Sequence, residues 1–208
     1  MADRKLKRIA VFASGFGSNL QALIDMSDES DFFGKIFLVF SNNKDAFALK
    51  RAKDNGIRTE CFSPKEFANR GLYDSAVCKI LAEYKIDLIV LAGYMLLAGP
   101  EIISRYTGRI LNIHPALLPS FKGTHAIADA FNYGVKITGV TVHFVDSGLD
   151  TGPIILQEAV EVGQDDSPES LEEKIHLVEH KIYPLAVKLF CQDRLQIVSG
   201  KVRIIQVI

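Results

Sequence analysis

The sequence predicts an α/β protein with a doubly wound, mostly parallel sheet. Three observations support this: short, continuous apolar runs, amphipathic helical segments between them, and glycine turns that separate the two. Strands buried on both faces are typical of parallel sheets, and strands that alternate with helices are joined by right-handed crossovers. We find no repeat, low-complexity segment or linker in the 208 residues, so we expect a single domain spanning residues 1–208.

In the first half of the chain, apolar runs alternate with amphipathic segments. We expect, in order, strand 9–13, a helix from residue 20, strand 36–40, helix 45–55, strand 57–62, helix 64–85 and strand 88–92. Pro64 suits the start of its helix, because proline is favoured in the first helical turn. The run 88–92 is the most apolar of all, so we expect it at the centre of the sheet.

The second half continues with a different mixture of elements. We expect helix 100–106, a strand ending near residue 114, helix 126–132, strands 138–145 and 153–156, a long helix and a hairpin within 195–205. Ser167 is the predicted N-cap of the long helix, and Pro184 is expected to kink or interrupt it. We expect the hairpin to close an edge of the sheet.

Composition and charge indicate an ordinary globular protein. Hydrophobic residues make up 48% of the chain and charged residues 24%, with a net charge of -1. A protein that binds nucleic-acid phosphates would need a basic face, so we expect no nucleic-acid partner. No apolar segment of signal length follows Met1, and no run approaches the roughly 18 residues of a membrane span, so we expect a cytoplasmic protein without membrane association. Cys61, Cys78 and Cys191 indicate neither disulfides nor a thiolate metal site.

The stretch from Asn112 to Pro119 organises the candidate chemistry. Side chains two residues apart on a strand point to the same face, so Asn112 and His114 should lie side by side. Pro115 cannot donate a ladder hydrogen bond, and Pro119 keeps the segment extended, so the strand is expected to stop and expose its tip. An amide beside an imidazole is suited to polarise a carbonyl and handle a proton. The alternative is a histidine satisfied by a neighbouring carbonyl group.

The turn from Ser14 to Asn19 joins the first strand to the first helix and contains Gly15 and Gly17. Glycines permit positive φ angles and close backbone approach, so successive N–H groups at a helix start can surround an anion. A dinucleotide fingerprint would need a third glycine where this chain has Leu20. We therefore predict a site for a single phosphate. The alternative is a tight turn whose serine or asparagine caps the helix.

Two further segments follow predicted strands. The turn 93–97 carries large apolar side chains that suit the wall of a flat pocket, with core packing as the alternative. The loop 146–153 holds two carboxylates, of which Asp150 either bonds the loop backbone or, if it meets His114, stabilises the imidazolium. Ligands of doubly wound sheets bind beyond the carboxyl ends of the strands, where the turn 15–19, the turn at Gly93 and the segment 112–119 are all expected to fall.

Residues 176–180 match the H-x-x-E-H pattern of a class of zinc metallopeptidases. His176 and His180 share a helix face, but a catalytic zinc of this kind needs a third protein ligand, usually an acid well downstream. Asp193 is the one acid that follows, close to the predicted hairpin. We therefore expect no metal.

Together these motifs resemble those of the folate-dependent formyltransferases, and closely those that act on glycinamide ribonucleotide. The resemblance covers essentially the whole chain and rests on residues 14–21, 91–95, 111–119, 143–145 and 149–155. The trio Asn112, His114 and Asp150 is specific to the family, and the glycine turn narrows it to this member. Methionyl-tRNA formyltransferases add a C-terminal nucleic-acid-binding domain, and formyltetrahydrofolate deformylases add an N-terminal regulatory domain. We expect neither here.

The resemblance implies a Rossmann-like formyltransferase fold, with a phosphate-binding half of about residues 1–100 and a folate-binding, catalytic half of about residues 101–208. It implies transfer of the formyl group of 10-formyltetrahydrofolate to the amine of glycinamide ribonucleotide in purine biosynthesis. The folate is a co-substrate, and no metal is needed. The alternatives are a formyltetrahydrofolate deformylase and a non-catalytic nucleotide-binding domain. A monomer and a homodimer both remain open.

The resemblance also implies roles for individual residues. The catalytic residues would be Asn112, His114 and Asp150. The substrate-binding residues would be Gly17, Ser18 and Asn19 at the phosphate, Glu179 at the amine, and His176 beside the phosphate or ribose. The folate would contact Arg70 near its benzoyl-glutamate end, and Met95, Leu96, Leu97, Ala98, Asn112, Asp146, Ser147, Gly148, Leu149 and Asp150 around the pterin. Some relatives have a basic residue where this chain has Leu96, so contacts there would come from the backbone.

Overall fold

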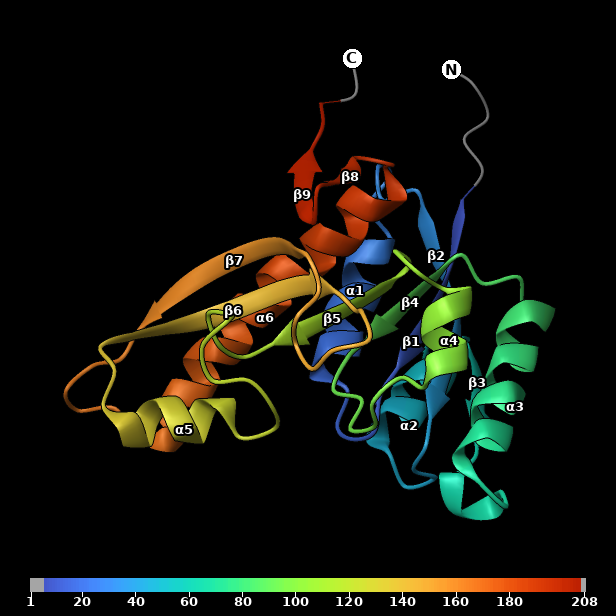
Figure 1. The fold of residues 1–208 in the computed structure, drawn as a ribbon, viewed down its shortest axis with the longest axis horizontal. Helices are drawn as coiled ribbons and strands as arrows, with labels where there is room; N and C mark the ends of the chain where they lie inside the picture. The colour runs from blue at the N-terminus through green and yellow to red at the C-terminus, as the bar shows by residue number, and fades with distance from the viewer. Residues whose placement is uncertain (1–5, 207–208) are drawn as a thin grey trace. The chain divides into compact units, whose positions relative to one another are not determined.

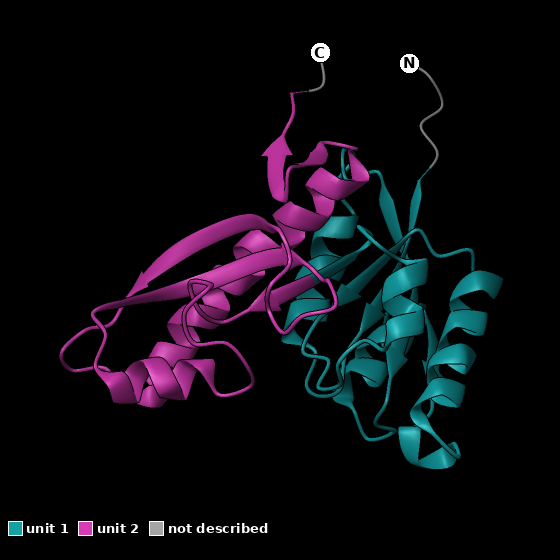
Figure 2. Ribbon diagram, viewed as in Figure 1, with its two compact units in different colours: residues 1–111 teal, residues 112–208 magenta. Residues whose placement is uncertain are grey.

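The structure is a computed structural model and describes residues 6–206 (Figure 1). Residues 1–5, which open the stretch expected to lack a signal segment, lie outside the described residues. The chain forms two compact units, residues 1–111 and 112–208 (Figure 2). A seven-stranded sheet has the strand order β3-β2-β1-β4-β5-β6-β7, and β8 and β9 form a separate two-stranded sheet. The expected mostly parallel sheet with flanking helices is confirmed.

The first unit alternates parallel strands with helices, as predicted. Its strands are β1 (Lys7–Phe12), β2 (Gly34–Ser41), β3 (Arg58–Cys61) and β4 (Leu88–Leu91), and each pairs in parallel with its neighbour. Its α-helices are α1 (Ser18–Ser27), α2 (Phe47–Asp54), α3 (Arg70–Glu83) and α4 (Pro100–Arg105). All residues of β4 are buried, and β4 is the middle strand of the seven. The prediction that the most apolar run is central is confirmed.

The predicted continuous helix 64–85 is wrong at its start. A single 3₁₀ turn, η1 (Pro64–Glu66), comes first, and α3 begins only at Arg70. The Asn69 side chain accepts a hydrogen bond from the Leu72 N–H group at 3.0 Å. This side-chain cap satisfies a backbone donor that a continuous helix would have bonded internally, and so it starts a new helix.

The second unit contains most of β5 (Ile110–His114), together with α5 (Ala126–Tyr133), β6 (Ile137–Phe144), β7 (Ile154–Glu161) and α6 (Pro168–Cys191). Strands β6 and β7 are antiparallel. Helix α6 packs against β6, β7 and α5. Ser167 caps α6 as predicted, because its side chain accepts a hydrogen bond from the Ser170 N–H group at 3.2 Å.

The expected interruption of α6 at Pro184 is wrong. The helix runs through this residue as one element of 24 residues. Pro184 is buried, and its neighbours Tyr183 and Ala186 are fully buried in the core. Burial of this apolar face offsets the backbone hydrogen bond that proline cannot make.

The C-terminal hairpin forms where it was predicted but does not join the large sheet. Strands β8 (Leu195–Val198) and β9 (Lys201–Ile204) pair only with each other among the described strands. Ser199 and Gly200 both have positive φ angles, 49° and 75°, as a tight two-residue hairpin turn requires. The turn therefore specifies the pairing within the hairpin. Strand β9 lies near β7, the edge strand of the large sheet, but the described residues form no ladder between them.

The glycine turn before α1 is held closely against α2. Gly17 has a φ of 77°, and a Cβ atom at this position would lie 2.8 Å from the Cβ atom of Ala48. The Ala48 N–H group donates to the Gly15 carbonyl oxygen at 3.1 Å. Gly56 has a similar φ of 68° but open space around it.

Gly17→Ala should lower the free energy of unfolding by about 3 kcal/mol, because it combines a left-handed backbone with overpacking against Ala48. Gly56→Ala is the matched control and should cost only the backbone strain, about 1 kcal/mol. Urea unfolding of both variants checks this. If both variants lost the same free energy of unfolding, α2 would have moved aside, and the close approach of Gly17 to Ala48 would not affect stability.

Candidate active site

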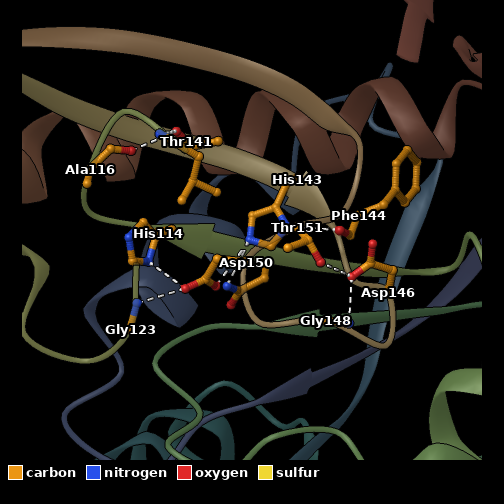
Figure 3. Close-up of polar contacts among 12 residues, drawn as sticks. His114, Ala116, Gly123, Thr141, His143, Phe144, Asp146, Gly148, Asp150 and Thr151 are labelled. Carbon is orange, nitrogen blue, oxygen red and sulfur yellow. Dashed lines mark hydrogen bonds and ion pairs between the residues drawn. The ribbon is translucent and has the colours of Figure 1, made fainter. Parts of the chain in front are cut away.

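Four polar side chains of the second unit meet where β5 and β6 end. Figure 3 shows three of them, His114, His143 and Asp150. Asn112 and His114 belong to β5, His143 to β6, and Asp150 to the loop between β6 and β7. The three residues singled out in the sequence are thus brought into one cluster, with His143 as a fourth member.

His114 is buried, with polar groups at both ring nitrogens. Its Nε2 lies 2.7 Å from the carbonyl oxygen of Phe121, which can only accept, so Nε2 carries a proton. Its Nδ1 faces the Oδ2 atom of Asp150 at 3.6 Å. The neighbouring carbonyl considered from the sequence is therefore present, and Asp150 faces the second ring nitrogen.

Asp150 is placed by an unusual backbone conformation. Its φ is 51°, in the left-handed region, which aspartate tolerates better than most residues. Its Oδ2 accepts the Gly123 N–H group at 3.0 Å, and its Oδ1 lies 3.7 Å from His143 Nε2. Asp150 therefore does both things that the sequence offered as alternatives: it bonds the backbone and it meets His114.

Asp146 has a different role in the same loop. Its Oδ1 accepts hydrogen bonds from the Gly148 N–H group at 3.0 Å and from the Thr151 hydroxyl at 2.7 Å. These local bonds close the turn. Of the two carboxylates in the loop, Asp146 shapes it and Asp150 points to the histidines.

His143 was missed as a functional candidate in the sequence. Its Nδ1 donates to the Phe144 carbonyl oxygen at 2.8 Å, so Nε2 of the neutral ring accepts from the Asn112 Nδ2 amide at 3.2 Å. Burial lowers the pKa of His143, and this outweighs the Phe144 carbonyl and Asp150, which favour the charged form. The available signal was Thr141 and His143, two polar residues on one face of a largely apolar strand.

The segment after β5 differs from its prediction. The strand ends at His114 as expected, but residues 115–121 fold back and His114 is buried. Thr141 Oγ1 donates to the Ala116 carbonyl oxygen at 2.7 Å and accepts the Leu118 N–H group at 3.0 Å, and Gln157 donates to the Leu118 carbonyl oxygen at 3.0 Å. These side chains satisfy the backbone that leaves the ladder, so it need not stay extended. The Leu118–Pro119 peptide bond is cis.

Of the other predicted contacts, Ser147 and Leu149 lie in the loop 146–150 of the second unit, and the phosphate and remaining folate contacts lie in the first unit. Gly17 is the N-cap of α1, so the first N–H groups of the helix follow a left-handed glycine, and no serine or asparagine is the cap. Met95 and Leu97 have exposed fractions of 67% and 70%, so neither is core packing, while Leu96 and Ala98 are half-buried. Arg70 lies at the start of α3.

The two predicted substrate contacts on α6 differ in exposure. Glu179 is buried, with an exposed fraction of 6%, and His176 is half-buried with its Nε2 3.9 Å from Glu172 Oε1. The His176 and His180 rings lie nearly parallel, with centroids 6.2 Å apart. Across residues 6–206, His, Cys, Asp and Glu side chains form no group of three or more arranged to hold a metal. In the same range no helix is long and apolar enough to cross a membrane.

Comparison with known proteins identifies the family. Residues 7–187 match the family model described as formyl transferase. The chain is 42% identical over 183 residues to phosphoribosylglycinamide formyltransferase of Bacillus subtilis, covering 88% of this chain and 94% of that protein. It is 45% identical over 201 residues to the human trifunctional purine biosynthetic protein adenosine-3, where it spans only 20% of the relative's length.

Solved structures agree with this assignment. Glycinamide ribonucleotide transformylase 1 of Symbiobacterium toebii matches with a TM-score of 0.94 and 43% identity, over 97% of this chain and 95% of that chain. A formyltetrahydrofolate deformylase of Pseudomonas syringae is more distant, with a TM-score of 0.86 and 27% identity over 97% of this chain and 66% of that one. The chain therefore belongs to the formyl transferase family.

Proposed function

We propose that this protein transfers the formyl group of 10-formyltetrahydrofolate to the amine of glycinamide ribonucleotide, which yields formylglycinamide ribonucleotide and tetrahydrofolate in purine biosynthesis. The observation that carries the proposal is the cluster of Asn112, His114 and Asp150 in a chain that matches phosphoribosylglycinamide formyltransferase over 94% of that relative's length. The more distant likeness to a deformylase supports the alternative less well.

The chemistry is an attack by a neutral amine on the formyl carbon, which places negative charge on the formyl oxygen. The Asn112 amide has two N–H bonds, and His143 accepts one of them, so the second is available to the oxyanion. His114 Nδ1 lies 3.6 Å from Asp150, too long for a good hydrogen bond, so an Nδ1–H group would still have room to donate to the oxyanion. One such preorganised donor is typically worth about 3 kcal/mol in the transition state.

Asp150 completes the proton balance of the reaction. The attacking amine loses one proton, and the departing folate nitrogen gains one, so no net proton is needed. The Asp150 carboxylate stabilises the His114 imidazolium and accepts the amine proton, directly or through water, before the folate nitrogen takes it. The tetrahedral intermediate collapses without any covalent bond to the protein.

The remaining roles concern the binding of the two substrates. The first N–H groups of α1, at Gly17, Ser18 and Asn19, would bind the single phosphate, because a helix start attracts anions. Glu179 would hold the amine, and His176 would lie beside the phosphate or ribose. We assign the pterin to the turn 95–98 and to the loop 146–150, largely through backbone groups. Two bound substrates held in this way react with a large advantage of proximity.

We place the reaction in the cytoplasm, with small-molecule substrates and with neither nucleic acid nor membrane as a partner. The three cysteines are free, which agrees with a reducing compartment. A monomer and a homodimer are both compatible with this function.

The first test is a spectrophotometric assay of folate product formation. With 10-formyltetrahydrofolate and glycinamide ribonucleotide we expect turnover, and none when the amine is omitted. His114→Ala should lower kcat by about 100-fold or more, because it removes a donor to the oxyanion and the partner of Asp150. Turnover without the amine would identify a deformylase, and its absence under every condition would favour a nucleotide-binding domain.

A second test uses the neutral state of His143. Its pKa is lowered in the folded protein, so folding disfavours its proton. The resulting contribution to stability is full above the ordinary pKa of about 6.5 and is lost as the pH falls below it. Urea unfolding at pH 7.5 and pH 5.5 should therefore show a smaller acid-induced loss in His143→Gln, which keeps an acceptor for Asn112, than in the wild type. An equal loss in both proteins would contradict a neutral His143.

A further inference from the structure

Three side chains on one face of α3 hold the segment 93–99 of the first unit. Tyr73 and Asp74 lie three and four residues after Arg70, so both are neighbours of Arg70 on the helix surface. An Arg70 terminal nitrogen donates to the Leu97 carbonyl oxygen. The Tyr73 and Tyr94 hydroxyl groups are hydrogen-bonded at 2.6 Å. Helix α3 is thus hydrogen-bonded to the turn at two residues, Leu97 and Tyr94.

Asp74 is the buried member of this cluster. Its side chain has an exposed fraction of 2%, and its Oδ1 accepts from Arg70 Nε at 2.9 Å. A Cβ atom at position 99 would overlap the Asp74 carboxylate, so the carboxylate lies directly against the backbone of Gly99 where α4 begins. A buried carboxylate is costly unless it is paired. The burial of Asp74 therefore needs a structural reason, whereas an ion pair on the surface would not.

Two apolar side chains of the turn are exposed, whereas its backbone is hydrogen-bonded. Met95 and Leu97 are largely exposed, although the backbone between them is anchored. The Met95 N–H group donates to Ser14 Oγ at 2.9 Å, and the Ser14 N–H group donates to the Gly93 carbonyl oxygen at 3.0 Å. The turn is therefore fixed through its backbone while its apolar side chains remain exposed. Such preorganisation lowers the entropy cost of binding a flat ligand.

We propose that Asp74 and Arg70 are a positioning pair that fixes the turn 93–99 for the folate, with Arg70 acting through the Leu97 carbonyl group. Two of the directed donors of Arg70 are already used by Asp74 and Leu97, and its guanidinium lies 5.3 Å from the centre of the Tyr73 ring. Family resemblance places Arg70 near the benzoyl-glutamate end of the folate. The observed hydrogen bond instead joins Arg70 to the backbone of the turn at Leu97. This inference rests on the proposed formyl transfer.

Asp74→Asn tests the pair, because it keeps the size of the side chain and removes its charge. We expect the KM for 10-formyltetrahydrofolate to rise at least about tenfold, as for loss of a hydrogen bond to a charged group. The KM for 10-formyltetrahydropteroate, which lacks the glutamate, should rise by the same factor. The kcat and the KM for glycinamide ribonucleotide should stay within about twofold, because neither depends on the turn.

Asp54→Asn is the matched control, since Asp54 forms an exposed pair with Lys50 four residues earlier on α2, at 2.8 Å. It should change neither KM. Unchanged KM values for both folates in Asp74→Asn would overturn the proposal. A rise confined to the glutamate-bearing folate would also overturn it, because Asp74 would then merely aim Arg70 at the ligand's carboxylate.

Hydrogen exchange of the unliganded protein tests the same pair independently of any activity. In Asp74→Asn, backbone amides of residues 94–99 should exchange faster, while those of β1 and β4 keep the wild-type rate. Unchanged exchange at the turn, or an equal increase across the whole first unit, would overturn the proposal. If the wild type turned over neither folate, the proposed function would fail, and this measurement would still decide on the positioning pair.

Discussion

The candidate active site depends on two backbone carbonyl groups that decide where the protons of two histidines lie. The Phe121 carbonyl accepts a hydrogen bond from Nε2–H of His114, and the other ring nitrogen of His114 faces Asp150. The Phe144 carbonyl accepts a hydrogen bond from Nδ1–H of His143, which leaves the other ring nitrogen of His143 as an acceptor. Two imidazoles beside one carboxylate are therefore held in different orientations: His114 presents Nδ1 to Asp150, and the neutral ring of His143 presents Nε2 to Asn112. One suits the stabilisation of negative charge, and the other orients an amide.

In both units, side-chain hydrogen bonds fix the backbone next to the candidate site residues. In the second unit, Thr141 and Gln157 bond the chain that leaves β5, which brings the Phe121 carbonyl to His114. In the first unit, Asp74 and Arg70 hold the turn that presents Met95. Thr141 and Asp74 are buried, and a buried polar group must be bonded, so these two side chains tolerate few arrangements. The backbone segments beside them are restricted in the same way.

The sequence by itself determined the order of the strands and helices, because periodicity and caps act over a few residues. The apolar run of β4 was expected at the centre of the sheet, Ser167 at the start of α6, and the C-terminal hairpin in its place. Asn112 and His114 were expected on one face because strand geometry requires it. The family resemblance then indicated Asp150, which local patterns alone left ambiguous.

Only the tertiary structure decided which partners these residues meet. The continuity of α6 through Pro184, the folding back after Pro115 and the separate hairpin all depend on packing between segments far apart in the chain. The neutral state of His143 and the burial of Asp74 also depend on the tertiary structure around them. Hydrogen bonds and burial of this kind join residues that sequence spacing does not relate, so local patterns predict the elements but not the contacts between them.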